Sequence, residues 1–153
     1  MYPIVLTQDF KVLVIGAGRA SKIKLKSLTQ NFTDITCISL EFDSEIDKLN
    51  IKKIKDNFYN LNLKFFDEFN MIYFTFEYPT ELKKEIFLLN IIEYLKESNK
   101  LLNCSSKPKL GNFINPCTRK YKDTILSIST LNPKKSIKLA NKLMKILKNI
   151  KSF

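Results

Sequence analysis

With 153 residues, the chain is long enough for one domain, or for one domain with a small appendage. Hydrophobic residues make up 44% of it, which is enough for a packed core. No apolar run reaches the roughly 18 residues that a membrane-spanning helix needs, and no signal-peptide pattern is present, so we expect a soluble, cytoplasmic protein.

The net charge is strongly positive, at +11, from 26 Lys and Arg against 15 Asp and Glu. Such an excess attracts polyanions: nucleic acid, an acidic membrane, or a phosphate or polycarboxylate ligand. A generally lysine-rich composition explains it equally well. The aromatic residues lie in apolar strings such as 73–76, which is typical of a core and not of an exposed surface for stacking bases. We therefore predict neither a nucleic-acid nor a membrane partner.

Histidine is absent, which removes the usual general base near neutral pH and the commonest metal ligand. The three cysteines, Cys37, Cys104 and Cys117, form no C-x-x-C pair. We interpret them as buried, reduced thiols and predict no metal site.

Strands and helices alternate over the first hundred or so residues. The pattern predicts strands at 11–15, 34–39, 71–76 and 100–104, with a short, weaker one between 51 and 58, and helices at 20–30, 44–49 and 80–97. Ser44 is the expected cap of the second helix. We expect the third helix to bury Leu82, Ile86, Leu89, Ile92 and Leu95. This alternation predicts an α/β fold: a Rossmann-like, doubly wound parallel sheet with right-handed crossovers.

The alternation stops near residue 112. Two strands, at 113–119 and 124–129, are joined by a turn at 120–123 and followed by a helix at 134–150. One face of that helix carries Ile137, Ala140, Met144 and Leu147, and another carries lysines, which we interpret as a solvated face. We therefore predict a Rossmann-like domain at 1–112 and, at 113–153, a β-hairpin plus helix suited to homodimer formation.

The segment Gly16-Ala17-Gly18-Arg19-Ala20-Ser21 fits the pattern G-x-G-x-x-small between a strand and a helix. The first glycine allows the turn, the second lets the backbone approach a pyrophosphate, and the small residue lets the helix pack on the strand. A tight turn without a ligand is the alternative. The acid that binds the ribose of NAD is expected about 20 residues on, where Ser39 stands, with Glu41 two residues later. Arg19 could meet a 2′-phosphate, so NAD and NADP both stay open.

Taken in order, these segments resemble the precorrin-2 dehydrogenase family, the dehydrogenase and ferrochelatase module of siroheme synthase. The resemblance spans nearly the whole chain. Its strongest segments are Met1 to Leu6, Gly16-Ala17-Gly18, Ser39-Leu40-Glu41, Phe74 to Pro79, Leu102 to Ser106, Phe113-Ile114-Asn115-Pro116, Ile128-Ser129-Thr130 and Ser136 to Leu143.

The resemblance implies NAD-dependent oxidation of precorrin-2 to sirohydrochlorin in siroheme synthesis; some members also insert Fe²⁺. Both tetrapyrroles carry eight carboxylates, which suits a basic protein. The expected cofactor contacts are Gly16, Ala17, Gly18, Arg19 and Ala20 for the pyrophosphate, Ser39 and Glu41 for the adenosine ribose, and Thr75, Phe76 and Glu77 for the nicotinamide. Asn103, Ser105 and Lys107 are expected to border the tetrapyrrole.

One departure concerns catalysis. The family's active-site aspartate falls at Ser106, and a serine does not replace a carboxylate as base or iron ligand at neutral pH. Longer family members also continue into a further helical domain. Two alternatives follow: a shortened enzyme with a more open site, or a non-catalytic homologue that binds a dinucleotide or a tetrapyrrole as a sensor, carrier or partner subunit.

Overall fold

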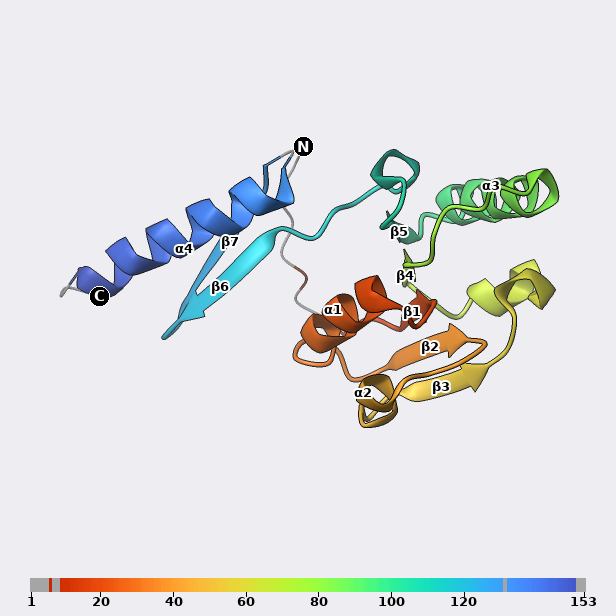
Figure 1. The fold of residues 1–153 in the computed structure, drawn as a ribbon, viewed down its shortest axis with the longest axis horizontal. Coiled ribbons are helices and arrows are strands. Elements are labelled where there is room, and N and C mark those ends of the chain that lie inside the picture. The colour runs from red at the N-terminus through yellow and green to blue at the C-terminus, as the bar shows by residue number, and fades with distance from the viewer. Residues whose placement is uncertain (1–5, 7–8, 131, 151–153) are drawn as a thin grey trace. The chain divides into compact units, whose positions relative to one another are not determined.

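The computed structural model describes residues 6, 9–130 and 132–150, so the expected contributions of the opening residues 1–5 and of Leu131 lie outside it. The chain forms two compact units, which meet in the sequence between Phe113 and Ile114. We call them the first and the second unit (Figure 1). No helix in the described ranges is both long and apolar enough to cross a membrane.

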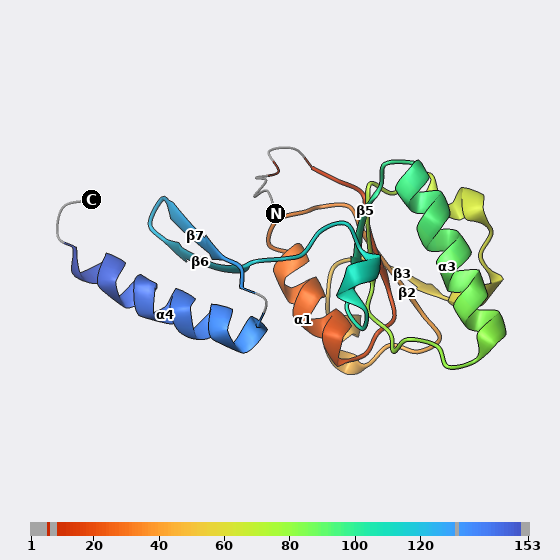
Figure 2. The same ribbon diagram turned by 90° about the horizontal axis from the view of Figure 1, so that it is seen from above.

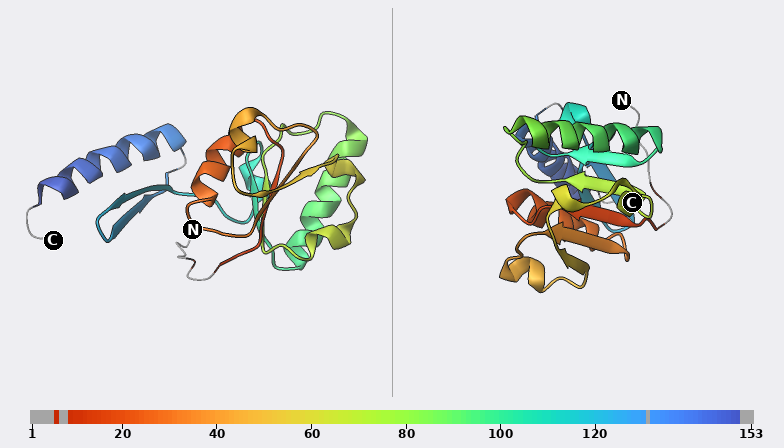
Figure 3. Two further views of the ribbon diagram at one scale, coloured as in Figure 1. Left: turned by 90° about the horizontal axis from the view of Figure 1, so that it is seen from below. Right: turned by 90° about the vertical axis from the view of Figure 1, so that its right-hand side faces the viewer.

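The first unit is a parallel sheet of five strands in the order β3-β2-β1-β4-β5. The strands are β1 (Val12–Ile15), β2 (Ile35–Ser39), β3 (Lys52–Lys55), β4 (Met71–Phe74) and β5 (Leu101–Cys104). The right-hand view in Figure 3 shows the five strands side by side in this order. The connections include helices α1 (Arg19–Leu28), α2 (Ser44–Asp47) and α3 (Leu82–Glu97), and the 3-10 turns η1 (Phe58–Asn60), η2 (Leu63–Phe66) and η3 (Pro108–Leu110). The predicted doubly wound α/β fold is confirmed.

Helices cover both faces of this sheet (Figure 2). Successive residues of a strand point to opposite faces. Val12 and Val14 pack with Leu25 and Leu28 of α1, whereas Leu13 and Ile15 belong to the core cluster on the α3 side. The central strands are buried on both faces, as their continuous apolar runs predict.

Helix α3 exists where it was expected, but the face assigned to it was wrong in part. Leu88, Ile91, Ile92 and Leu95 are buried. Leu82 is 68% exposed and Ile86 49%, and Leu89 is also exposed. The helix carries apolar residues at helical spacing on more than one side, so its periodicity alone did not identify the side that meets the sheet.

The cap of α2 was also wrongly assigned. The residue before the helix, Asp43, is the cap: its Oδ1 accepts hydrogen bonds from the amides of Glu45 and Ile46, each at 3.1 Å. Ser44 is instead the first helical residue. A carboxylate at this position also interacts favourably with the helix dipole.

The second unit is an antiparallel hairpin, β6 (Cys117–Tyr121) and β7 (Thr124–Ile128), packed against helix α4 (Pro133–Asn149). Strand β6 begins four residues later than expected, after Pro116, which has no N–H to donate to a ladder. Ala140 and Met144 of α4 are buried as expected, together with Ser136. Ile137 is 47% exposed, so it does not belong to the buried face.

Candidate functional site

The turn after β1 is held in a conformation that favours glycine. Gly16 has φ +101°, and its N–H donates to the carbonyl of Ile38 at 2.8 Å. A Cβ at this position would lie 3.1 Å from Thr75 Oγ1 and 3.4 Å from Phe76 Cβ. Both the backbone angle and the close neighbours therefore select glycine here.

Gly18 is different, because a Cβ added to it would meet no heavy atom of the described residues within 4 Å. It lies at the N-terminus of α1 with an ordinary φ of −80°. Within the described part of the chain no side chain caps this helix, and its first turn contains no acid. Open space next to uncapped helix amides is the arrangement that holds phosphate in dinucleotide-binding folds. The residues at this turn fit a pyrophosphate.

A buried pair of hydroxyl groups, from Ser21 and Thr75, packs against the backbone of the turn. Thr75 Oγ1 donates to the carbonyl of Ile15 at 2.7 Å and lies 2.5 Å from Ser21 Oγ. Ser21 is fully buried and Thr75 is 7% exposed. The small residue of the motif thus joins α1 to the end of β4. The hydroxyl of Thr75, which we expected on the nicotinamide side, is engaged in this support.

A cavity of about 170 Å³ opens at the carboxyl ends of β1, β2 and β3. Gly16, Ser39 and Phe76 line it, as the expected cofactor residues would, but exposed Glu41 does not. The full lining is Ile15, Gly16, Ile38, Ser39, Leu40, Asp56, Asn57, Phe58, Tyr59 and Phe76. Ligands bind at this edge of open parallel sheets.

Four consecutive lining residues, Asp56 to Tyr59, were missed by the sequence reasoning. They follow the weakly patterned strand β3. Asn57 caps η1 by accepting a hydrogen bond from the Tyr59 amide at 3.1 Å, and Phe58 packs in the core against Phe74. The available signal was the Asp-Asn pair directly after a strand, a combination typical of a capped turn.

The other expected cofactor contacts are Ala17, Arg19 and Ala20, around the start of α1, and Glu77, after β4. Ala17 and Ala20 are half-buried, while Arg19, the first residue of α1, and Glu77 are exposed. Neither Arg19 nor Glu77 lines the cavity.

The residues expected to border a substrate follow β5. Asn103 is 7% exposed, and its Nδ2 donates to the carbonyl of Phe113 at 3.1 Å. Ser105 Oγ is buried without a hydrogen-bond partner among the described residues, so it can still bind a polar group. Ser106 is exposed. Lys107 Nζ lies 3.3 Å from the centroid of the Tyr78 ring, in a cation–π contact.

Two buried thiols, on β2 and at the end of β5, are protected from ionisation. Burial raises the pKa of Cys37 to about 12 and that of Cys104 to about 11. Cys37 Sγ also donates a weak hydrogen bond to the Gly16 carbonyl, at 3.6 Å. Since the thiolate is the nucleophilic form, both side chains are unreactive at neutral pH.

The second unit holds most of the net positive charge. From Ile114 onward the sequence has ten Lys and Arg against one Asp, so this part supplies nine of the eleven net charges. Arg119, Lys145 and Lys148 line an open cavity of about 420 Å³ together with Asn141 and Met144. Arg119 is held there by Asn141, whose Oδ1 accepts from its Nε at 3.1 Å. This surface suits a ligand with several negative charges.

A family model described as "Putative NAD(P)-binding" matches residues 4–117. The "Putative precorrin-2 dehydrogenase" of Methanocaldococcus jannaschii is 31% identical over 138 residues, which are 85% of this chain and 65% of that protein. The chain thus spans a little under two thirds of that relative. Among solved structures, "SirC, precorrin-2 dehydrogenase" matches with a TM-score of 0.70 at 19% identity, covering 95% of this chain and 71% of the other. This last likeness concerns the fold.

Proposed function

Because the chain belongs to the NAD(P)-binding family that its residues 4–117 match, we propose that it oxidises precorrin-2 to sirohydrochlorin with NAD as hydride acceptor. The observation that carries the proposal is the 31% identity to a protein named as a precorrin-2 dehydrogenase, which extends over 85% of this chain. The fold match to a second protein of that name, over 95% of the chain, supports it.

The residues of the first unit bind and orient the cofactor in this proposal. The amides at the start of α1 and the open space at Gly18 receive the pyrophosphate, and Ser39 lies at the adenosine end. Glu77 follows β4 on the nicotinamide side, whereas Phe76 lines the cavity at the adenosine end. A bound nicotinamide supplies the chemistry by accepting a hydride from the substrate. The chain's own contribution is alignment and exclusion of water.

Polar groups after β5 orient the substrate. Ser105 has an unpartnered buried hydroxyl, and Lys107 presents a cation positioned by Tyr78. Precorrin-2 carries eight carboxylates, so the cation of Lys107 suits it electrostatically. The side chain of Ser106 is a hydroxyl and cannot accept a proton as a carboxylate would. The proton released during oxidation then goes to solvent or to a substrate carboxylate. Iron insertion stays a prediction from the family resemblance.

The test is a turnover assay with purified protein, precorrin-2 and NAD⁺, followed by NADH absorbance. We expect NADH formation in proportion to protein. Binding of either ligand without NADH formation would instead support the non-catalytic alternative. A Ser106→Asp variant with an increased rate would show that the exposed position after β5 is where the chemistry occurs; an unchanged rate would place the chemistry elsewhere.

We also propose that the second unit forms a homodimer. Helix α4 exposes an apolar stripe at helical spacing, in which Leu139 is 39%, Leu143 37% and Ile146 50% exposed. A second copy of the same helix can cover this stripe symmetrically. Sedimentation should give a dimer that Leu143→Glu converts to monomer, whereas Lys142→Glu, on the neighbouring exposed position, should leave it intact. A monomeric wild-type protein would contradict the proposed dimer.

A cytoplasmic location of the protein stays a prediction from the sequence.

A further inference from the structure

The end of β3 brings a carboxylate to the place where the dinucleotide motif expects one. Residue Asp56 directly follows β3, and its N–H donates to the carbonyl of Ser39 at 3.2 Å. The ladder pairs Ser39 with Lys55, which fixes this register. Asp56 and Ser39 therefore stand side by side at the carboxyl edge of the sheet, and both line the cavity of about 170 Å³ that also includes Gly16.

In dinucleotide-binding folds an acid after the second strand accepts hydrogen bonds from the ribose hydroxyls. Here a serine, Ser39, ends that strand, and the acid two residues later, Glu41, does not line the cavity. Asp56 does line it. Its Oδ1 accepts from the Asn57 amide at 2.6 Å, and in the described part of the chain no hydrogen bond or ion pair engages its Oδ2. One oxygen is thus free to accept from a diol.

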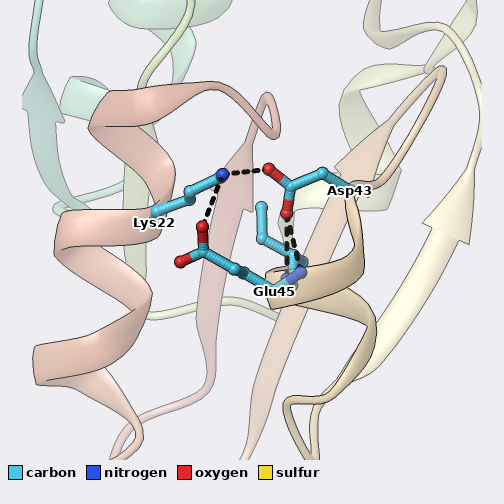
Figure 4. A network of polar contacts seen from close by, with 4 residues as sticks. Lys22, Asp43 and Glu45 are labelled. Carbon is cyan, nitrogen blue, oxygen red and sulfur yellow. Dashed lines mark hydrogen bonds and ion pairs between the residues drawn. The ribbon is translucent and has the colours of Figure 1, made fainter.

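The acids at the start of α2, Asp43 and Glu45, already share a lysine as their ion-pair partner. Lys22 of α1 forms ion pairs with Asp43 and with Glu45, the latter at 3.2 Å (Figure 4). These contacts raise the pKa of Lys22 and lower the pKa of Asp43. Lys22 is consequently committed to α2 and is not available to a 2′-phosphate. Arg19 is exposed and does not line the cavity. Of the residues that line the cavity, Asp56 is the one with a charged side chain.

We propose that Asp56 determines the choice of dinucleotide: its carboxylate accepts the ribose hydroxyls of NAD and repels the 2′-phosphate of NADP. The acid thus follows β3, whereas the general motif has it at the end of the adjacent strand β2. The inference rests on membership of the NAD(P)-binding family and on the cavity, so it is independent of whether the chain oxidises precorrin-2.

Equilibrium binding tests the inference without any substrate. The variant is Asp56→Asn, which keeps the oxygen that accepts from Asn57 and so preserves the turn; Glu41→Gln is the matched control. NADH and NADPH are titrated by fluorescence. Hydrogen bonds to charged groups are among the stronger ones, so we expect Asp56→Asn to weaken NADH binding by about tenfold and to leave NADPH binding equal or tighter. Glu41→Gln should change neither.

Two short probes read the subsite directly. Wild-type protein should bind adenosine 5′-monophosphate more tightly than adenosine 2′,5′-bisphosphate, and Asp56→Asn should reduce or reverse that preference. An equal loss of both probes in Asp56→Asn would overturn the inference, because the carboxylate would then contact the adenine ring or only support the turn. A change in preference on Glu41→Gln alone would also overturn it. Thermal unfolding checks that both variants are folded.

Discussion

Two glycines in one turn allow the folding role and the binding role of that turn to be separated. Replacing Gly16 by alanine forces a Cβ onto a residue with φ +101° and brings it to 3.1 Å from Thr75 Oγ1, which is itself hydrogen-bonded to Ser21 and Ile15. A positive φ costs a residue with a side chain about 1–2 kcal/mol, and displacement of the buried hydroxyl pair adds to it. We expect Gly16→Ala to lower the free energy of unfolding by about 2–3 kcal/mol.

Gly18→Ala is the matched substitution with the opposite expectation. The backbone angle of Gly18, φ −80°, is open to any residue, and the new methyl group would contact nothing within 4 Å. Its effect on the free energy of unfolding should stay within about 0.5 kcal/mol, since the poorer N-cap propensity of alanine is offset by its smaller loss of chain entropy on folding. The methyl group would however fill the space next to the amides of α1. We therefore expect NADH to bind at least about tenfold more weakly.

The assay combines denaturant unfolding with fluorescence titration of NADH for wild type, Gly16→Ala and Gly18→Ala. We expect a loss of stability in Gly16→Ala alone, and in Gly18→Ala a loss of NADH binding without a loss of stability. Wild-type affinity in Gly18→Ala would refute the assignment of the open space to the pyrophosphate. Wild-type stability in Gly16→Ala would refute the argument from backbone angle and packing.

Gly111→Ala should destabilise by about 2 kcal/mol or more in denaturant unfolding, because its Cβ would lie 2.6 Å from the backbone oxygen of Leu102; unchanged stability would mean that the loop moves freely away from β5. Cys37→Ala should flatten the alkaline pH dependence of stability. Burial raises the pKa of Cys37 from 9.0 to about 12, so the folded state retains the proton that the unfolded state releases. The contribution of the protonated Cys37 thiol to the free energy of unfolding is therefore complete below pH 9. It is lost as the pH rises toward 12, by up to about 1.4 kcal/mol per pH unit relative to the variant. Parallel curves of stability against pH for the two proteins would contradict this. Asn132→Ala should cost about 1 kcal/mol, measured by thermal unfolding, because Asn132 Oδ1 accepts from the first amides of α4 at 3.0 and 3.3 Å. Asn132→Gly should cost only about a few tenths of a kcal/mol, and equal losses in the two variants would argue against the cap.

The predictions from sequence held where the signal was local. The run 11–15 followed by Gly16-Ala17-Gly18 specified a buried strand, a sharp turn and a helix start, because burial on both faces and a positive φ are imposed on consecutive residues. Alternation of strands and helices then led to the doubly wound sheet, and the comparisons confirm the family resemblance drawn from the ordered motifs. The small residue Ser21 was expected to pack α1 against a strand, and it does so through Thr75.

What the sequence could not decide depends on contacts between distant segments. Which side of α3 faces the sheet is set by the surface that the strands present, and two apolar stripes satisfied the helical period equally well. The hydroxyl pair of Ser21 and Thr75 joins residues 54 positions apart. Asp56 lines the cavity at the strand ends because β3 pairs with β2 in one particular register. The sequence by itself determined the fold and the glycine turn after β1; the pairing of strands, which no local pattern encodes, decided which acid lines the cavity beside that turn.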